Sequence, residues 1–317
     1  MTRQNRLWLD WLILAALIFI PRIFNLDVFL TADEPLFLEH ARSFASGLPN
    51  GDLEQTLGIG YPGVTVAAWA APVVSRTVTE LGAYTMGRLA VTFLNGLLML
   101  VLFGLARTLL GRWPALIGIV LLAVDPYTLG YSRLLHVAAP LALFMSLAGV
   151  SFMLWLRESR SRWLILTGLF SGLALLTKST ALLLLPMMAS IVLVWTTGSK
   201  TWRDGRWWWR LSLAALTIAA LAAVTFFVLW PAMWVEPTKA LSLTFGKLFT
   251  DQQAGTGNLG LFWLGQFVED PGLAFYPVAF VLKATPWLLI GLLLNIFFLV
   301  TPKFQTRDLK ITTVSLW

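Results

Sequence analysis

The sequence predicts an all-α protein that crosses a membrane several times. Of its 317 residues, 58% are hydrophobic, and the mean hydropathy is +0.76. Only 12% are charged, against about 25% in a typical soluble domain. Several stretches reach the length of about 20 apolar residues that a helix needs to cross a bilayer. We therefore expect one polytopic domain over residues 1–317, built as a bundle of helices.

Eight stretches are predicted as spanning helices from their length and apolar content. They cover residues 7–26, 84–106, 113–131, 137–156, 163–177, 179–197, 210–234 and 276–300. No small-residue cleavage site follows the first stretch, so we expect it to be retained as a helix. The separation of the fifth stretch from the sixth rests on the polar run Lys178-Ser179-Thr180.

Charge divides the loops between these helices into two sets. One set carries 14 of the 23 lysines and arginines, and the other carries 12 of the 16 aspartates and glutamates. Loops rich in lysine and arginine face the cytoplasm. We therefore expect both termini inside and the acidic loops outside. The same rule accounts for the net charge of +7, so no nucleic-acid partner is expected.

Two of the outer loops, 27–83 and 235–275, are long. The first contains an apolar stretch, 62–78, with irregular and polar flanks, which predicts a helix lying in the membrane interface. The second mixes tryptophan, phenylalanine and glycine with acids, and we expect it to be interfacial as well. Elsewhere, Gly168 and Gly172 form a GxxxG pattern, which predicts close packing between helices.

The first outer loop holds an acidic pair, Asp33-Glu34, followed by Pro35. A carboxylate at the membrane surface can take a proton from an attacking hydroxyl or amine, as glycosyl transfer requires. Adjacent side chains on a helix diverge by about 100°, so one acid could face the reaction while the other holds a backbone N–H. Pro35 suits a first helical position, which predicts a helix over 36–46 with Glu34 as its N-cap. Alternatively, both acids are solvated and only cap that helix.

Basic side chains also occur near the predicted outer ends of helices, where the orientation rule disfavours them. They are Arg133, His136, Lys178 and Lys283. A phosphate head group would explain them through charge-assisted hydrogen bonds. The alternatives are snorkelling to the interface, pairing with a loop acid and, for His136, a packing role.

Composition excludes or disfavours several kinds of site. The chain has no cysteine and only two histidines, His40 and His136, so thiolate sites are excluded and a histidine-based metal site is not expected. No phosphate-binding loop, dinucleotide fingerprint or nucleophile elbow occurs, which favours a lipid-carried activated donor over a soluble nucleotide. The acidic pair could act as a base or bind a divalent cation, so we assign no metal and leave the cofactor open.

A series of short motifs along residues 5–300 carries a family resemblance. The motifs are Asp33-Glu34, Tyr61-Pro62-Gly63-Val64-Thr65, Asp125-Pro126-Tyr127, Tyr131-Ser132-Arg133-Leu134-Leu135-His136, Gly172-Leu173-Ala174-Leu175-Leu176-Thr177-Lys178-Ser179, Trp230-Pro231-Ala232-Met233-Trp234 and Phe275-Tyr276-Pro277-Val278. In this order and spacing the chain resembles the bacterial membrane glycosyltransferases of family 39, which have the C-type glycosyltransferase fold. Protein O-mannosyltransferases and lipid A aminoarabinose transferases are relatives.

The resemblance implies an enzyme of the plasma membrane of bacterial or archaeal type. Such an enzyme takes a sugar, mannose-like or aminoarabinose-like, from a polyprenyl-phosphate donor at the outer face and passes it to a hydroxyl on a protein, lipid or glycan. Asp33 matches the first-loop acid held to be the catalytic base or the group that positions the acceptor, and Glu34 is its companion. Arg133, Lys178 and Lys283 match positions near the donor phosphate, where cations would stabilise the charge of the leaving group.

The chain departs from the family pattern at two positions. Ala138 stands where relatives commonly have an aspartate in a His-Val-Asp-Ala run, and Tyr61 stands where they often have histidine. Family members are usually longer, so we expect a fragment or a natural short form. Two alternatives stay open: a catalytically inactive member, and a transporter of polyprenyl-linked lipid. A transporter predicts polar residues near helix centres and inverted repeats, and the sequence indicates neither.

Overall fold

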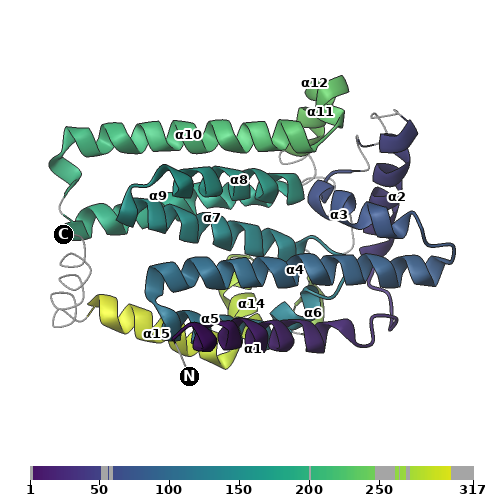
Figure 1. Cartoon of the computed structure of the whole chain (residues 1–317), viewed down its shortest axis with the longest axis horizontal. Helices are drawn as coiled ribbons and strands as arrows, with labels where there is room; N and C mark the ends of the chain where they lie inside the picture. Colours follow the sequence, from purple (N-terminus) through teal and green to yellow (C-terminus); the bar gives the residue numbers. More distant parts are fainter. Residues whose placement is uncertain are drawn as a thin grey trace. The chain divides into compact units, whose positions relative to one another are not determined.

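The computed structural model describes residues 3–50, 56, 60–199, 201–246, 261–263, 265–268 and 272–300. The chain divides into two compact units, Met1–Gly246 and Lys247–Trp317. Helices make up most of the described residues of both units (Figure 1). The expected helical, multi-pass membrane protein is confirmed at this level.

The first unit holds the long helices of the protein. Its elements are α1 (Arg3–Ile23), α2 (Glu34–Asn50), α3 (Val64–Val74), α4 (Glu80–Leu110), α5 (Arg112–Val124), α6 (Pro126–Tyr131), α7 (Ala138–Glu158), α8 (Ser161–Thr177), η2 (Ser179–Leu183), α9 (Leu184–Ser199), η3 (Thr201–Arg203), α10 (Gly205–Leu229), α11 (Ala232–Val235), α12 (Pro237–Leu241) and the π-helical turn η4 (Ser242–Gly246). The second unit holds an antiparallel pair of short strands and two helices. They are β1 (Leu261–Trp263), β2 (Gln266–Val268), α14 (Phe275–Lys283) and α15 (Pro286–Val300).

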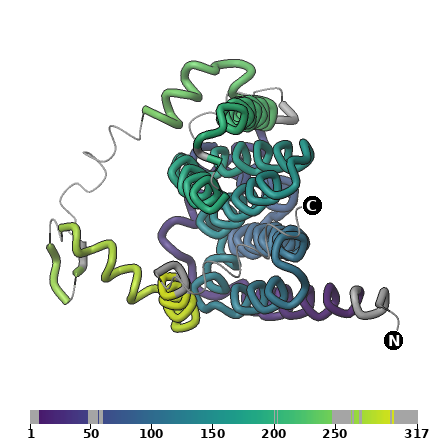
Figure 2. Tube along the Cα trace, turned by 90° about the vertical axis from the view of Figure 1, so that its left-hand side faces the viewer, coloured from purple at the N-terminus to yellow at the C-terminus, as the bar shows by residue number. Residues whose placement is uncertain are grey.

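Four long helices of the first unit pack in a row. Helix α4 contacts α7, α7 contacts α8, and α8 contacts α10, as Figure 1 shows from the side and Figure 2 nearly along the helix axes. Met99, Leu147 and Leu154 lie fully buried between these helices. Much of their remaining surface is also apolar, as is typical of helices in lipid.

Glycine allows the close approach of α8 and α10. A Cβ atom on Gly168 would lie 2.5 Å from the Cβ atom of Leu221, and one on Gly172 would lie 2.6 Å from the Cβ atom of Thr225. Both distances are far below a normal carbon–carbon contact. The close packing that the GxxxG pattern predicts is therefore confirmed.

The bundle has two chemically different ends. At one end, Arg157 donates a hydrogen bond of 2.7 Å to the carbonyl oxygen of Leu109, and Arg210 donates one of 2.7 Å to the Ser159 hydroxyl. At the other end, the hydroxyl groups of Thr65 and Thr177 lie 2.6 Å apart and join α3 to α8. Arg157 and Arg210, which belong to the predicted basic loops, therefore lie at the opposite end of the first unit from Thr65 and Thr177.

Helices α2 and α3 form within the first predicted outer loop. Helix α2 begins at Glu34, two residues before the predicted start at 36. Helix α3 packs against α2, α4 and α8 and buries Val66 and Ala70 completely. Gly63 precedes α3 with φ of 108°, and a Cβ atom there would lie 3.1 Å from Phe37. Glycine is therefore suited both to the backbone angle and to the space at this turn.

Fewer described segments qualify as spans than the eight predicted, and α1 and α8 are not among them. In the described part of the chain, four segments are long and apolar enough to cross a membrane: Glu80–Leu110, Ala138–Glu158, Ser179–Ser199 and Gly205–Leu229. A bent pair, α14 with the start of α15, would make a fifth. The predicted helix 113–131 is broken, because Asp125 ends α5 and caps α6. The predicted helix 276–300 is bent by 116° ahead of Pro286, because proline does not continue a helix that precedes it.

Candidate active site

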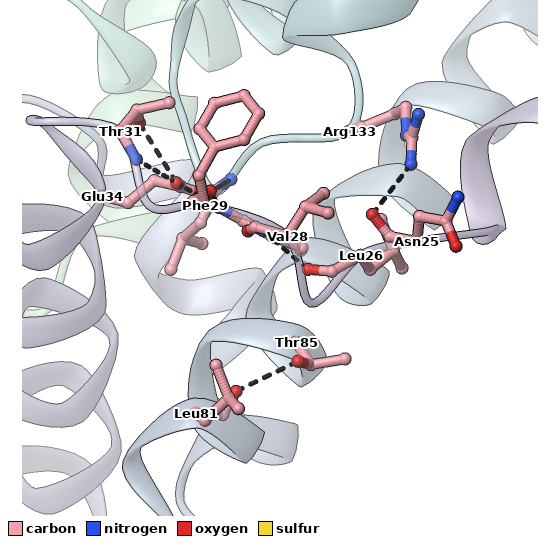
Figure 3. A network of polar contacts seen from close by, with 11 residues as sticks. Asn25, Leu26, Val28, Phe29, Thr31, Glu34, Leu81, Thr85 and Arg133 are labelled. Carbon is pink, nitrogen blue, oxygen red and sulfur yellow. Dashed lines mark hydrogen bonds and ion pairs between the residues drawn. The ribbon is translucent and has the colours of Figure 1, made fainter.

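Glu34 forms a buried ion pair with Arg88. Its side chain is fully buried, and its two oxygens accept hydrogen bonds of 2.6 Å from Nε and Nη2 of Arg88. Arg88 lies on α4 and also donates to the carbonyl oxygens of Leu26, Val28 and Phe29. All five guanidinium N–H groups therefore have acceptors. Through these hydrogen bonds Arg88 ties the connection between α1 and α2 to the bundle. Figure 3 shows this connection from Asn25 to Glu34.

The carboxylate of Glu34 has no free acceptor position left. Besides Arg88, it accepts hydrogen bonds from the backbone N–H and hydroxyl of Thr31 and from the backbone N–H of Leu135, at 2.9, 3.1 and 3.0 Å. Burial raises the pKa of Glu34, but the hydrogen bonds from Arg88, Thr31 and Leu135 together outweigh it and hold the pKa below the usual value. Glu34 is therefore an ionised group with a structural role, and its carboxylate is not available to a ligand.

Asp33 is the exposed member of the acidic pair. Its side chain is 67% exposed, and its Oδ2 atom lies 3.2 Å from Nε2 of His136. Among the described residues, no other hydrogen bond to the Asp33 carboxylate is present. Oδ1 is therefore available to a ligand.

His136 is held in one orientation beside Asp33. Its Nδ1 atom accepts a hydrogen bond of 3.0 Å from the backbone N–H of Ala138. The rings of Phe37 and Tyr131 contact it edge-on at centroid distances of 5.3 and 5.5 Å. Burial lowers the pKa of His136, and the interaction with Asp33 opposes this shift only in part. The imidazole is therefore neutral at pH 7.

Lys178 lies at the break between α8 and η2. It is exposed, and its ammonium group has no hydrogen-bond or ion-pair partner within the described ranges. Its charge lowers the pKa of His136. Lys178 follows the end of α8 and His136 precedes the start of α7. These two helices, joined through Ser159 and Arg160, pack against each other. The structure thus brings Asp33, His136 and Lys178 to the same end of the first unit.

Arg133, another predicted phosphate ligand, is not gathered there. Arg133 turns toward the connection after α1, where it donates hydrogen bonds to the carbonyl oxygens of Phe24 and Asn25. Figure 3 shows it at the opposite end of this connection from Glu34. The Nε atom of Arg133 is buried and has no acceptor. Lys283 ends α14 in the second unit and is exposed.

An apolar groove of about 1120 Å³ lies between α9 and α10. Its walls include Leu185 and Met188 of α9 and Ala219 and Ala222 of α10. It also reaches Ala181 of η2, three residues beyond Lys178. Lys178 itself is not among the lining residues.

The acidic pair does not offer two carboxylates to a cation, because both oxygens of Glu34 already bind Arg88 and backbone donors. Over the ranges that the structure describes, no three residues among histidine, aspartate and glutamate gather as metal ligands would. Of the two acids of the pair, Asp33 is the exposed one.

Arg88 is the main residue that the sequence analysis missed. It lies near the start of the predicted span 84–106, next to the predicted acidic loop 27–83, where a basic residue is as unexpected as Arg133 or Lys178. That position was a usable signal. Its pairing with Glu34, 54 residues earlier, could not be predicted from spacing.

A family model for dolichyl-phosphate-mannose-protein mannosyltransferases matches residues 66–234. The chain belongs to this family. The match covers α3 to α11 and includes Arg133, His136 and Lys178, whereas Asp33 and Lys283 lie outside it. The protein is accordingly a membrane glycosyltransferase of mannosyltransferase type. No curated protein and no solved structure matches the chain significantly.

Proposed function

We propose that the protein transfers a sugar from a polyprenyl-phosphate donor to an acceptor hydroxyl, with Asp33 as the general base. The observation that carries the proposal is the exposed Asp33 carboxylate, which has a free Oδ1 and lies at the same end of the unit as the unpaired Lys178. A base and a cation near each other are what this displacement needs.

The chemistry assigns one task to each group. The acceptor hydroxyl gives its proton to Asp33 while its oxygen attacks the anomeric carbon of the sugar. The bond between that carbon and the phosphate oxygen breaks, and polyprenyl phosphate leaves as an anion. Lys178 neutralises part of the charge that develops on this phosphate. Glu34 supports Asp33 by fixing the backbone beside it, through Thr31 and Arg88.

Arg133 and Lys283 are further proposed phosphate ligands. The buried Nε atom of Arg133, which has no acceptor, supports the first assignment. The second rests on the motif around α14 alone. A divalent cation is not needed for the proton transfer that we propose.

The groove between α9 and α10 is proposed to hold the polyprenyl tail. Its apolar walls suit an isoprenoid, and its end at η2 would bring the phosphate to Lys178. Replacing Ala219 with phenylalanine would fill part of the groove. We expect a higher KM for a long-chain donor and an unchanged KM for a short-chain analogue.

We further propose eight spans, cytoplasmic termini, and helices α2 and α3 in the outer interface. The active site would then face the outside, where a hydroxyl of a protein, lipid or glycan is accessible. The location of Arg157 and Arg210 at the end of the bundle opposite to Thr65 and Thr177 supports this orientation.

The test is release of polyprenyl phosphate from a panel of labelled polyprenyl-phosphate hexoses and pentoses. Membranes with the wild type are compared with membranes holding Asp33→Asn or the control Asp27→Asn, an exposed acid of the same connection. We expect release by the wild type and the control, and a loss of about 10²- to 10⁴-fold in Asp33→Asn, as for other general bases.

Two other outcomes would contradict the proposal. Equal release by the wild type and Asp33→Asn would remove Asp33 from the chemistry. No release from any donor by folded wild type would favour the inactive alternative, in which Ala138 replaces an acid that the reaction needs.

A further inference from the structure

The contact between His136 and Asp33 fixes where the proton on the imidazole lies. Nδ1 of His136 accepts the backbone N–H of Ala138 at 3.0 Å and therefore carries no hydrogen. The single proton of the neutral ring is then on Nε2. That atom lies 3.2 Å from Oδ2 of Asp33 and donates to it.

The ring has little freedom to leave this position. Phe37 of α2 and Tyr131 of α6 contact it from two sides. The preceding residue, Leu135, is fully buried, and its N–H binds Glu34. The same buried carboxylate therefore anchors the chain next to Asp33 and the chain next to His136. Because the His136 ring is held firmly, its Nε2–H group loses little conformational entropy when it donates a hydrogen bond to Asp33.

We propose that His136 is a positioning residue, which holds the Asp33 carboxylate by Oδ2 and so directs Oδ1 at the acceptor hydroxyl. This rests on the proposed function of Asp33. His136 gives up no proton in the reaction and acts through Asp33 alone.

The charged groups around His136 agree with this role. Asp33 contacts it just before α2, and Glu34 at the start of α2 and Lys178 after α8 act on it through their charges. Lys178 and burial both favour the neutral ring, so Nδ1 stays free to accept the Ala138 N–H at neutral pH. Protonation at low pH would place a hydrogen on Nδ1 and break that contact.

The kinetic test compares His136→Ala with His136→Gln in the full chain. Loss of a hydrogen bond to a charged group predicts that kcat falls about 10- to 100-fold in His136→Ala, while the KM for the donor changes less than about twofold. The amide nitrogen of glutamine can reach the place of Nε2, so His136→Gln should recover most of kcat. A purely structural role would not divide the variants in this way, and equal unfolding temperatures would exclude misfolding.

Wild-type kcat in His136→Ala would overturn the proposal and leave the role of Asp33 intact. If no variant and no wild type transfers sugar, the proposed function fails first, and the contact is tested without activity. Nitrogen NMR of histidine-labelled protein in detergent should show an unprotonated Nδ1 and a protonated Nε2 for His136, and Asp33→Asn should shift the Nε2 signal. A signal that Asp33→Asn leaves unmoved would also overturn the proposal.

Discussion

Asp33 and Glu34 are neighbours in the chain, but the structure gives them opposite surroundings. Glu34 is fully buried against Arg88, and backbone donors fill its remaining acceptor positions. Asp33 is mostly exposed and holds one contact, to His136. The partners that decide this difference come from α4 and from the connection between α6 and α7. Residue type alone therefore does not reveal which of two adjacent acids is available to a substrate.

The two pairs also differ in what they connect. Arg88 binds three carbonyl oxygens as well as Glu34, so the buried pair shapes a whole segment of backbone. His136 binds one carboxylate oxygen of Asp33 and leaves the other free. Breaking the first pair should cost stability, and breaking the second should cost activity.

The largest effect is expected from Arg88→Ala, which leaves the Glu34 charge buried and unpaired. Removing one partner of a buried ion pair costs about 3–5 kcal/mol, so the unfolding temperature in detergent should fall sharply. The control is Arg42→Ala, which breaks an ion pair with Glu80 whose side chains are 46% and 67% exposed. That change should cost less than about 1 kcal/mol. Similar losses in both variants would contradict the difference between buried and exposed pairs.

Replacing Lys178 tests whether this cation, at the same end of the unit as the exposed Asp33, binds the donor phosphate. Lys178→Gln removes the charge, and loss of a charge-assisted contact of about 1.5–3 kcal/mol predicts a fall of about 10- to 150-fold in kcat/KM for the donor. Lys178→Arg should retain more of this activity because it keeps the charge. Steady-state release of polyprenyl phosphate measures both. Equal activity in the wild type and Lys178→Gln would remove Lys178 from the phosphate site.

The close packing of α8 and α10 involves neither Asp33 nor Glu34. Its loss therefore gives a free energy of unfolding with which the effects at the two acids can be compared. Gly172→Val would place its Cβ atom against Thr225, and overpacking of this kind costs about 1–3 kcal/mol. Gly118→Ala is a control, because nothing lies within 4 Å of the added atom. Thermal unfolding in detergent compares the two variants. An unchanged unfolding temperature in Gly172→Val would show that α8 and α10 can move apart without a loss of stability.

The smallest effect is a pH dependence at His136. Its pKa lies below 6.5 in the folded protein because of burial, so the folded state resists protonation of this ring. The stability that it contributes is complete above about pH 6.5 and declines as the pH falls through the lowered pKa. The unfolding temperature of the wild type should therefore fall more steeply below pH 6.5 than that of His136→Gln. Parallel curves would contradict the burial of this ring.

The sequence predicted the long helices well because their signal is local. The stretch 84–106 lies within α4, the stretch 137–156 begins one residue before α7, and the stretch 210–234 overlaps α10 but runs five residues past its end at Leu229. The Gly168-Gly172 pattern marks a real close contact. The breaks at Asp125 and before Pro286 were missed. Apolar content runs on across both points, while the capping side chain and the proline interrupt the backbone.

The candidate site was predictable only in its exposed parts. The sequence analysis expected the two acids to diverge, and they do, although Asp33 lies in the turn before α2 rather than on the helix. The unusual positions of Arg133 and Lys178 follow from charge. The pairing of Glu34 with Arg88 and of Asp33 with His136 joins residues 54 and 103 positions apart. Such contacts depend on how the helices pack, which periodicity and spacing do not encode.

The most direct test is the unfolding temperature of Asp33→Asn measured beside that of Glu34→Gln. It requires no knowledge of the sugar or the acceptor. We predict that Asp33→Asn unfolds at the wild-type temperature, because its carboxylate is exposed and makes one contact. We predict that Glu34→Gln unfolds several degrees lower, because Arg88 loses its counter-charge. Equal temperatures for the two variants, or a larger loss in Asp33→Asn, would contradict the division of roles between the two acids.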